Sequence, residues 1–527
     1  MRNVFLLVFL IVYLNVTAQG KIDILHYKYE IELNDNNDTI YGKAEIKVKF
    51  DRPTKYINLD FVLQNNKGKG MIIDSISGPN VKNFTSYSDS LKINFPKPIF
   101  DDVVFYYIFY HGIPSDGLII SKNKYGHRTF FADNWPNRGH NWIPCVDDPA
   151  DKASVEFIVT APQHYQVVAN GILVEETNLT NNKKLTHWKE DVSVATKVMV
   201  IGAAEFAVSL AGIVNDCIPV YSWVYPEDRD KGFYDFAQAM EILPFFIKNV
   251  GPYGYKKLAN VQSKTTFGGL ENASAIFYAE NSVTGSREKE NLLAHEIAHQ
   301  WFGNMATEKS FAHLWLSEGF ATYYSILYFE KKYGADTATY MLNEDRNQVI
   351  AFAKNNDHSV IDETKDYMEL LNPNNYQKGS WVLHMLRRQM GDSVFHTSIK
   401  TYYAEYAGKN ADTKDLQKVF EKTSGKDLSV FFQQWLYTAG IPTLDVSWNY
   451  LPNEKKVSVT VKQLQKTSFV FSLEFQLKNS NGNNTIKTIP VSKQEETFVI
   501  SVKEKPASVI LDPNTSLLFS GNAMEKK

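Results

Sequence analysis

Hydrophobic and polar residues alternate along the N-terminal part of the chain. Residues 27–33 and 44–50 each place an apolar side chain at every second position, and the Asn- and Asp-rich stretch 34–38 separates them. A period of two is typical of half-buried strands, so these two runs predict a β-hairpin. Similar short strand signals, interrupted by Gly, Pro and Asn, continue to about Phe206. We therefore predict one β-domain over residues 19–215.

The spacing of apolar residues changes after Pro226 from two to the helical pattern of three and four. Residues 233–250 show the helical pattern first, and Gly251 follows them at a position where helices commonly stop. Later segments with the same pattern are 291–303, 314–333, 376–390 and 428–437. These segments predict a mainly helical domain over residues 216–442.

Strict alternation returns after Pro442. Residues 457–461 and 469–477 alternate between apolar and polar side chains, and the stretch 479–482 has the composition of a turn. We predict a small β-sandwich over residues 443–527. A chain of 527 residues is too long for one hydrophobic core, which agrees with this division into three domains. The predicted fold class is multidomain α+β.

The first residues have the layout of an export signal. Arg2 precedes an unbroken apolar run over residues 4–14, and small residues end that run at Ala18. We predict a signal peptide over residues 1–18 and a periplasmic or extracellular protein. The run is short for a bilayer span, although an uncleaved anchor is the alternative. No later segment is as apolar, so stable membrane insertion is not expected after cleavage.

Charge and cysteine content exclude several classes of function. The chain has 56 Lys and Arg against 59 Asp and Glu, a net charge of −3, which gives no basic surface for nucleic acid. Cys145 and Cys217 are the only cysteines; they could pair or could be two buried apolar residues. Two cysteines are too few for a cysteine-based zinc site. Nothing in the residue pattern predicts an oligomeric state.

The segment from His295 to His299 carries the clearest chemical signal. Residues four apart lie on one face of a helix, so His295 and His299 can bind one metal ion, and Glu296 beside them can accept a proton from water. Apolar neighbours on most faces predict that this helix is buried. Buried His and Glu without a partner would be costly, and a metal ion supplies that partner. Exposed histidines on a surface helix are the alternative.

A catalytic zinc ion needs three protein ligands and one open position. Eighteen residues separate His299 from Glu318, which stands in a second helical segment, and the chain can reverse at Gly303 between them. Most helical glutamates are exposed, but this one stands among Leu, Trp and Phe. We predict one zinc ion per chain, bound by His295, His299 and Glu318.

Four sequence blocks resemble those of the M1 (gluzincin) aminopeptidase family. They cover residues 268–272, 295–304, 315–321 and 376–379, and residues 144–149 are similar to the N-domain signature of that family. The resemblance implies a β-saddle N-terminal domain, a thermolysin-like catalytic domain and a β-sandwich. It also implies that the substrates are peptides with a free N-terminus.

The resemblance further implies a role for each residue of the site. Glu296 would be the general base, and Tyr376 would stabilise the oxyanion. Glu271 would bind the α-ammonium group of the substrate and so restrict cleavage to the first peptide bond. Gly268 and Gly269 would let an extended substrate lie against the backbone.

Three differences from the family pattern are visible in the sequence. Leu270 stands where the family usually has Met, a volume-conserving change. Asp133 lies near a position where many members carry a Gln or Glu that reaches the substrate. The chain stops after the predicted sandwich, where larger members continue into a helical domain, so we expect a more open site.

Other functions compete with the aminopeptidase. A thermolysin-like endopeptidase would share the metal chemistry, but an amine anchor at Glu271 disfavours it. A binding protein that has lost activity would be expected to show damage at the ligands, at Glu296 or at Tyr376, and these residues are intact. An epoxide-hydrolase side activity, which the resemblance allows, is the third alternative.

Overall fold

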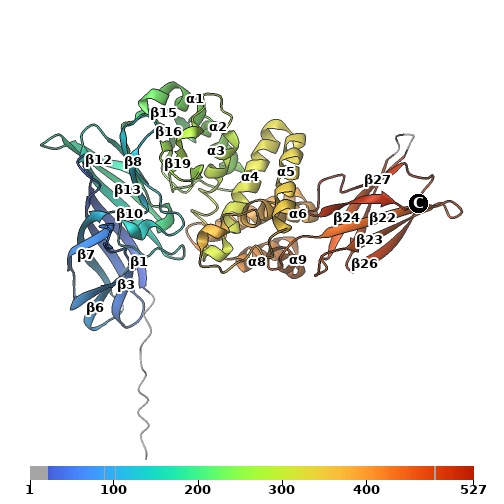
Figure 1. Ribbon diagram of the computed structural model, residues 1–527, viewed down its shortest axis with the longest axis horizontal. Coiled ribbons are helices and arrows are strands. Elements are labelled where there is room, and N and C mark those ends of the chain that lie inside the picture. Colours follow the sequence, from blue (N-terminus) through green and yellow to red (C-terminus); the bar gives the residue numbers. More distant parts are fainter. Residues whose placement is uncertain (1–21, 88, 101, 480–481, 483, 527) are drawn as a thin grey trace, which may run out of the picture.

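The computed structural model describes residues 22–526, apart from residues 88, 101, 480, 481 and 483. Three parts follow one another along the longest axis of the molecule: a β-rich N-terminal part, a mainly helical middle and a β-rich C-terminal part (Figure 1). The fold is therefore multidomain α+β. The predicted signal peptide lies outside the described residues. Within them, no helix is both long enough and apolar enough to cross a membrane.

The alternating runs of the N-terminal part pair into a seven-stranded sheet. The predicted hairpin is formed by β1 (Ile22–Glu32) and β2 (Ile40–Phe50), which pair antiparallel with their alternate residues buried. The remaining strands of the sheet are β4 (Gly70–Ser77), β7 (Val103–Ile113), β10 (Lys152–Pro162), β12 (Ile172–Asn178) and β13 (Lys183–Ala195), in the order β12-β13-β10-β1-β2-β7-β4.

Two smaller sheets complete the N-terminal part. One contains β8 (Leu118–Lys122), β9 (Arg128–Ala132), β11 (Gln166–Ala169) and β14 (Ile201–Ala204). The other contains β3 (Thr54–Asp60), β5 (Asn83–Tyr87) and β6 (Ser90–Ile99). The buried residues of the three sheets form one hydrophobic cluster. Cys145 is buried in this cluster, whereas Cys217 is exposed, and both are free thiols.

The middle part contains a sheet that the apolar spacing did not predict. Its strands are β15 (Ala207–Val214), β16 (Ile218–Val224), β17 (Leu258–Ser263), β18 (Gly269–Leu270) and β19 (Ala275–Ala279), in the order β15-β16-β17-β19-β18. The proposed boundary at 215–216 falls inside the β15–β16 hairpin. Every residue of β17 is buried, so its sequence carries no alternation.

Nine helices of the described chain lie in the middle part. They are α1 (Arg229–Phe236), α2 (Ala239–Asn249), α3 (Glu290–Ala298), α4 (Trp315–Tyr333), α5 (Ala335–Ala353), α6 (Gly379–Met390), α7 (Asp392–Tyr406), α8 (Thr413–Ser424) and α9 (Ser429–Leu436). The segment predicted as one helix over 233–250 is divided between α1 and α2. The segment predicted over 376–390 is divided too, because a π-helix, η7 (Asn374–Lys378), precedes α6.

Seven strands form two sheets in the C-terminal part. One sheet contains β22 (Thr443–Leu451), β23 (Lys456–Gln463), β26 (Glu495–Ser501) and β28 (Ser520–Glu525), and the other contains β24 (Phe471–Lys478), β25 (Thr485–Val491) and β27 (Ser508–Leu511). Their buried residues belong to the same hydrophobic cluster as the helices. The ring centroids of Trp435 and Phe469 lie 5.1 Å apart across this junction. The C-terminal part therefore shares its core with the helical part.

Candidate metal centre and substrate cavity

Three side chains converge at the middle of the molecule, of which His299 and Glu318 are buried and His295 is half-buried. The Nε2 atoms of His295 and His299 are 3.1 Å apart, and each lies 3.3 Å from Oε2 of Glu318. His295 belongs to α3, His299 follows its last residue, and Glu318 lies in the first turn of α4. Electron-pair donors at these distances repel one another unless a cation or a proton lies among them. The residues that the sequence predicted as ligands are therefore brought together.

The turn between α3 and α4 sets this geometry. Gly303 has a φ of 107°, a conformation that glycine adopts without strain, and a Cβ there would lie 2.2 Å from Oγ of Ser317. The chain reverses at this point, so the second helix returns past the first. Phe302 and Phe320 then pack with their ring centroids 4.5 Å apart. This contact holds Glu318 opposite the two histidines.

The orientation of His299 is fixed by its other ring nitrogen. Nδ1 lies 3.1 Å from the carbonyl oxygen of Phe302 and 3.0 Å from Oγ of Ser317. These contacts turn Nε2 toward Glu318, which is how histidine ligands are normally held by a second set of residues. Two imidazoles and one carboxylate are a donor set that suits zinc, so the residues fit the metal that the sequence predicts.

Glu296 lies against the backbone of β18. A Cβ on Gly269 would be 2.3 Å from Oε1 of Glu296, so only glycine allows the carboxylate to occupy this position. Burial raises the pKa of Glu296 to about 8, although the charge of His299 acts in the opposite direction. The carboxylate is thus a buried proton acceptor beside the ligand cluster.

Tyr376 reaches the same point from the π-helix. Its ring stacks on His295 at a centroid distance of 6.0 Å. Burial and the nearby carboxylate of Glu318 raise the pKa of Tyr376 well above its usual value, so the phenol keeps its proton and can donate it in a hydrogen bond. Gly319 and Gly379 allow this approach, because a Cβ on Gly319 would lie 2.9 Å from the backbone of Gly379.

Glu271 lies immediately beyond β18, and its backbone is held by the segment that follows α3. Nε2 of Gln300 and Nδ2 of Asn304 donate to its carbonyl oxygen at 2.8 and 2.6 Å. Its side chain is 6% exposed, yet Oε1 has no hydrogen-bond partner among the described residues. A buried carboxylate oxygen without a partner is costly unless a ligand supplies one.

The N-terminal part also contacts the segment that follows α3. Nζ of Lys152 donates to the carbonyl oxygens of Asn304 and Met305 at 3.0 and 2.9 Å. Lys197 forms a fully buried ion pair with Glu308. Neither lysine could be predicted from the sequence, because the contacts join segments more than one hundred residues apart and leave no local pattern.

A cavity of about 360 Å³ joins these groups. It is lined by all eight residues predicted for the site together with Trp135, Phe267, Leu270, Asn291, Leu292 and Leu371. Asp133 lies near a position where many family members carry a residue that reaches the substrate. In this chain it is fully buried and does not line the cavity. Trp135 and Phe267 were not predicted as site residues. Trp135 lies two residues after Asp133, and Phe267 directly precedes the block 268–272.

Comparison with known proteins agrees with this architecture. Residues 24–198 match the Peptidase M1 N-terminal domain, and residues 234–435 match the Peptidase family M1 domain. The two matches together contain most of the N-terminal part, the ligand cluster and the whole lining of the cavity.

Curated relatives cover different shares of the chain. The chain is 26% identical to "Probable aminopeptidase 2" of Sulfurisphaera tokodaii over 71% of this chain and 48% of that protein. It is 25% identical to "Aminopeptidase M1" of Arabidopsis thaliana over 62% of this chain and 40% of that protein. It is 24% identical to "Leucyl aminopeptidase" of Saccharolobus solfataricus over 94% of this chain and 65% of that protein. The chain spans about half the length of the first of these relatives. With both domain matches in the expected order, the chain belongs to the M1 family of peptidases.

Proposed function

We propose that the chain is a zinc-dependent aminopeptidase that hydrolyses the first peptide bond of peptides with a free N-terminus. The observation that carries this proposal is Oε1 of Glu271, which is buried, has no hydrogen-bond partner among the described residues and belongs to a residue that lines the same cavity as the ligand cluster. An α-ammonium group supplies both the missing hydrogen bond and the opposite charge. The relatives that are named aminopeptidases support the same activity.

His295, His299 and Glu318 would hold the zinc ion. A bound zinc ion would supply Lewis-acid chemistry at the centre of the cavity. Glu296 would take a proton from the attacking water and later return it to the amine that leaves. The contact of this carboxylate with Gly269 supports this role, because the substrate backbone would lie beside that glycine.

Tyr376 would donate its hydroxyl proton in a hydrogen bond to the carbonyl oxygen as negative charge develops there. Gly268 and Gly269 would let the substrate backbone approach the strand, because neither residue has a side chain. The distance between the amine site and the reacting carbonyl would then fix cleavage at the first bond. We also infer that the N-terminal part is the β-saddle and the helical part the thermolysin-like domain of the family.

The location of the protein is part of the proposal. The apolar run over residues 4–14 supports export, to the periplasm or the cell exterior. A comparison of the mass of the protein from the producing cells with that of the full chain would test cleavage after Ala18.

The test of function is a comparison of matched substrates. Zinc-loaded protein should release one residue at a time from free peptides and should leave their N-acetylated forms intact. Glu271→Ala should lower kcat/KM on free peptides by several hundred-fold, because a desolvated ion pair is lost. The same change should have little effect on substrates that lack the amine. Efficient cleavage of acetylated peptides at internal bonds would instead establish an endopeptidase.

A further inference from the structure

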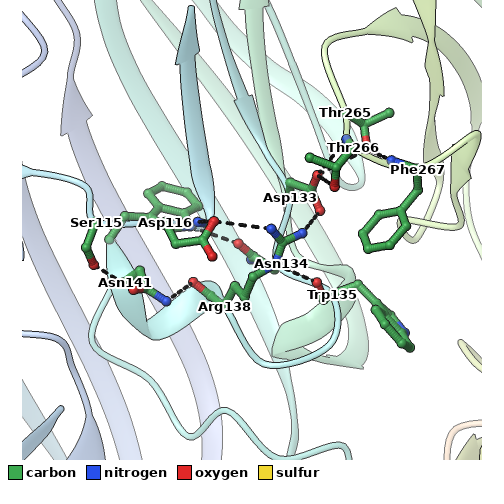
Figure 2. A network of polar contacts seen from close by, with 12 residues as sticks. Ser115, Asp116, Asp133, Asn134, Trp135, Arg138, Asn141, Thr265, Thr266 and Phe267 are labelled. Carbon is green, nitrogen blue, oxygen red and sulfur yellow. Dashed lines mark hydrogen bonds and ion pairs between the residues drawn. The ribbon is translucent and has the colours of Figure 1, made fainter. Parts of the chain in front are cut away.

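A buried carboxylate joins the two sides of the substrate cavity. Asp133, which directly follows β9, is fully buried and pairs with Arg138. Its other oxygen accepts a hydrogen bond from Oγ1 of Thr265 at 3.1 Å and two from N and Oγ1 of Thr266 at 3.3 Å. Figure 2 shows these contacts crossing from the N-terminal part to the loop before β18. One side chain therefore connects segments that are 132 residues apart.

Arg138 extends this connection to two aromatic residues of the cavity. Its Nε donates to the carbonyl oxygen of Trp135 at 2.8 Å, and its guanidinium lies 5.7 Å from the ring centroid of Phe267. The rings of Trp135 and Phe267 meet edge to face at 5.8 Å. Both rings lie on the same side of the ion pair in Figure 2, and both line the cavity. The Asp133–Arg138 pair therefore contacts both residues of one aromatic wall.

This wall and Glu271 line the same cavity, and hydrogen bonds connect the segments that carry them. Nδ2 of Asn134, the neighbour of Trp135, donates to the carbonyl oxygen of Met199 at 2.6 Å. One residue earlier, the carbonyl oxygen of Val198 accepts from the backbone N–H of Ala273 at 3.2 Å. Ala273 is two residues beyond Glu271. A substrate amine at Glu271 would therefore bring the side chain of the first residue toward Trp135.

We propose, building on the proposed function, that Trp135 and Phe267 form the subsite for a large apolar side chain on the first residue of the substrate, and that Asp133 and Arg138 are positioning residues that hold this subsite. Two aromatic rings bury apolar surface and offer no charge to a polar side chain. Differences in apolar contact of this kind change kcat/KM by 10- to 200-fold between related substrates.

The first experiment measures kcat and KM of the zinc-loaded full chain on aminoacyl fluorogenic substrates that carry Ala, Leu, Phe, Lys or Glu. Leu and Phe substrates should exceed the Ala substrate in kcat/KM by at least about 10-fold. Trp135→Ala and Phe267→Ala should each reduce this preference to about 3-fold or less, mainly by raising KM for Leu and Phe. The Leu-to-Ala ratio is kcat/KM for the Leu substrate divided by kcat/KM for the Ala substrate. A wild-type preference for Ala, Lys or Glu, or an unchanged Leu-to-Ala ratio in both variants, would overturn the assignment of the subsite.

The second experiment tests the positioning role. Asp133→Asn keeps the shape of the side chain and removes its charge, and Thr266→Val removes only one hydroxyl donor. Both should lower the Leu-to-Ala ratio and leave kcat/KM for the Ala substrate within about 3-fold. Asp133→Asn added to Trp135→Ala should cause no further loss of the ratio, because its effect passes through the wall. An unchanged ratio in both single variants, or full additivity, would overturn the positioning role.

A matched control separates these effects from a general loss of stability. Asp38→Asn breaks another ion pair of the N-terminal part, with Arg128 at 2.7 Å, and neither residue lines the cavity. Its Leu-to-Ala ratio should equal that of the wild type even if its melting temperature falls. Loss of the ratio in this control would show that selectivity follows stability and would overturn the proposal. Absence of cleavage of every free-amine substrate by the wild type would instead reject the aminopeptidase function itself.

Discussion

Gly269 and Glu296 are in such close contact that no side chain fits between them. A Cβ on Gly269 would lie 2.3 Å from one carboxylate oxygen and 2.4 Å from the carboxylate carbon of Glu296. The strand and the helix therefore meet through a residue without a side chain. The position of the proposed general base depends on that absence.

Gly269→Ala should displace the Glu296 carboxylate and lower kcat by about 100-fold or more, the usual contribution of a positioned base. The three ligands are not touched, so zinc content should stay near one per chain. Gly268 is a useful comparison, because the nearest atom to a Cβ there is Leu292 Cδ1 at 4.0 Å. Gly268→Ala should act mainly on KM. Equal losses of kcat in the two variants would argue against the contact with Glu296.

Removal of the metal should distinguish ligands from the base. A strong chelator should abolish activity, and added zinc should restore it. His295→Ala and Glu318→Ala should lose both bound zinc and activity, because each removes one of three donors. Glu296→Gln should bind zinc normally and lose most of its turnover. Metal analysis beside steady-state kinetics measures both quantities, and zinc loss in Glu296→Gln would reverse the assignment of roles.

The close approach of α4 and the π-helix should control Tyr376. Gly379→Ala inserts a methyl group 3.0 Å from Cα of Gly319, and overpacking of this kind costs about 1–3 kcal/mol. We expect the hydroxyl of Tyr376 to move away from the cluster, so kcat should fall while KM stays within a few-fold. Tyr376→Phe should give the same pattern. Because both changes act on one hydroxyl group, the double variant should be little slower than Tyr376→Phe alone, and a multiplicative loss would contradict this link.

A buried carboxyl group on α5 should make stability depend on pH. Burial raises the pKa of Asp345 from 3.8 to about 7, and its Oδ2 has no hydrogen-bond partner among the residues that the structure describes. A raised pKa means that the folded chain binds the proton more tightly than the unfolded chain. The resulting stability is complete below about pH 4 and is lost as the pH rises through 7.

Asp345→Asn should remove this pH dependence, because an amide does not titrate. At pH 8 the variant should be more stable than the wild type by roughly 1–3 kcal/mol. Urea unfolding at pH 5 and pH 8 would measure the difference. If the urea midpoint changed equally between pH 5 and pH 8 in the variant and the wild type, Asp345 would not be the cause of the pH dependence.

The metal ligands could be predicted because their positions follow from local rules. His295 and His299 are one helical turn apart, and the helix that contains Glu318 follows after the connection over residues 299–314. The apolar residues around them correctly indicated burial. The first hairpin and the strands near the C-terminus could be predicted equally well, because each buries one face and therefore alternates apolar and polar residues.

Other features could not be predicted, because they depend on contacts that leave no period in the sequence. The strand β17 is buried on both faces, and its sequence mixes apolar and polar residues without alternation. The π-helix before α6 continues an apparently regular helical pattern. Lys197 and Glu308 lie 111 residues apart, and nothing near either one identifies its partner. Trp135 meets Phe267 only after the N-terminal part has packed against the helical part.

The contact of Lys152 with the turn after the metal helix has a consequence for protein engineering. Two backbone carbonyl oxygens of that turn, those of Asn304 and Met305, receive their hydrogen bonds from a side chain of the N-terminal part. A shortened gene that encodes only the helical part would leave these acceptors and the charge of Glu308 without their lysines. Chimeras between relatives should therefore exchange the first two parts as one unit.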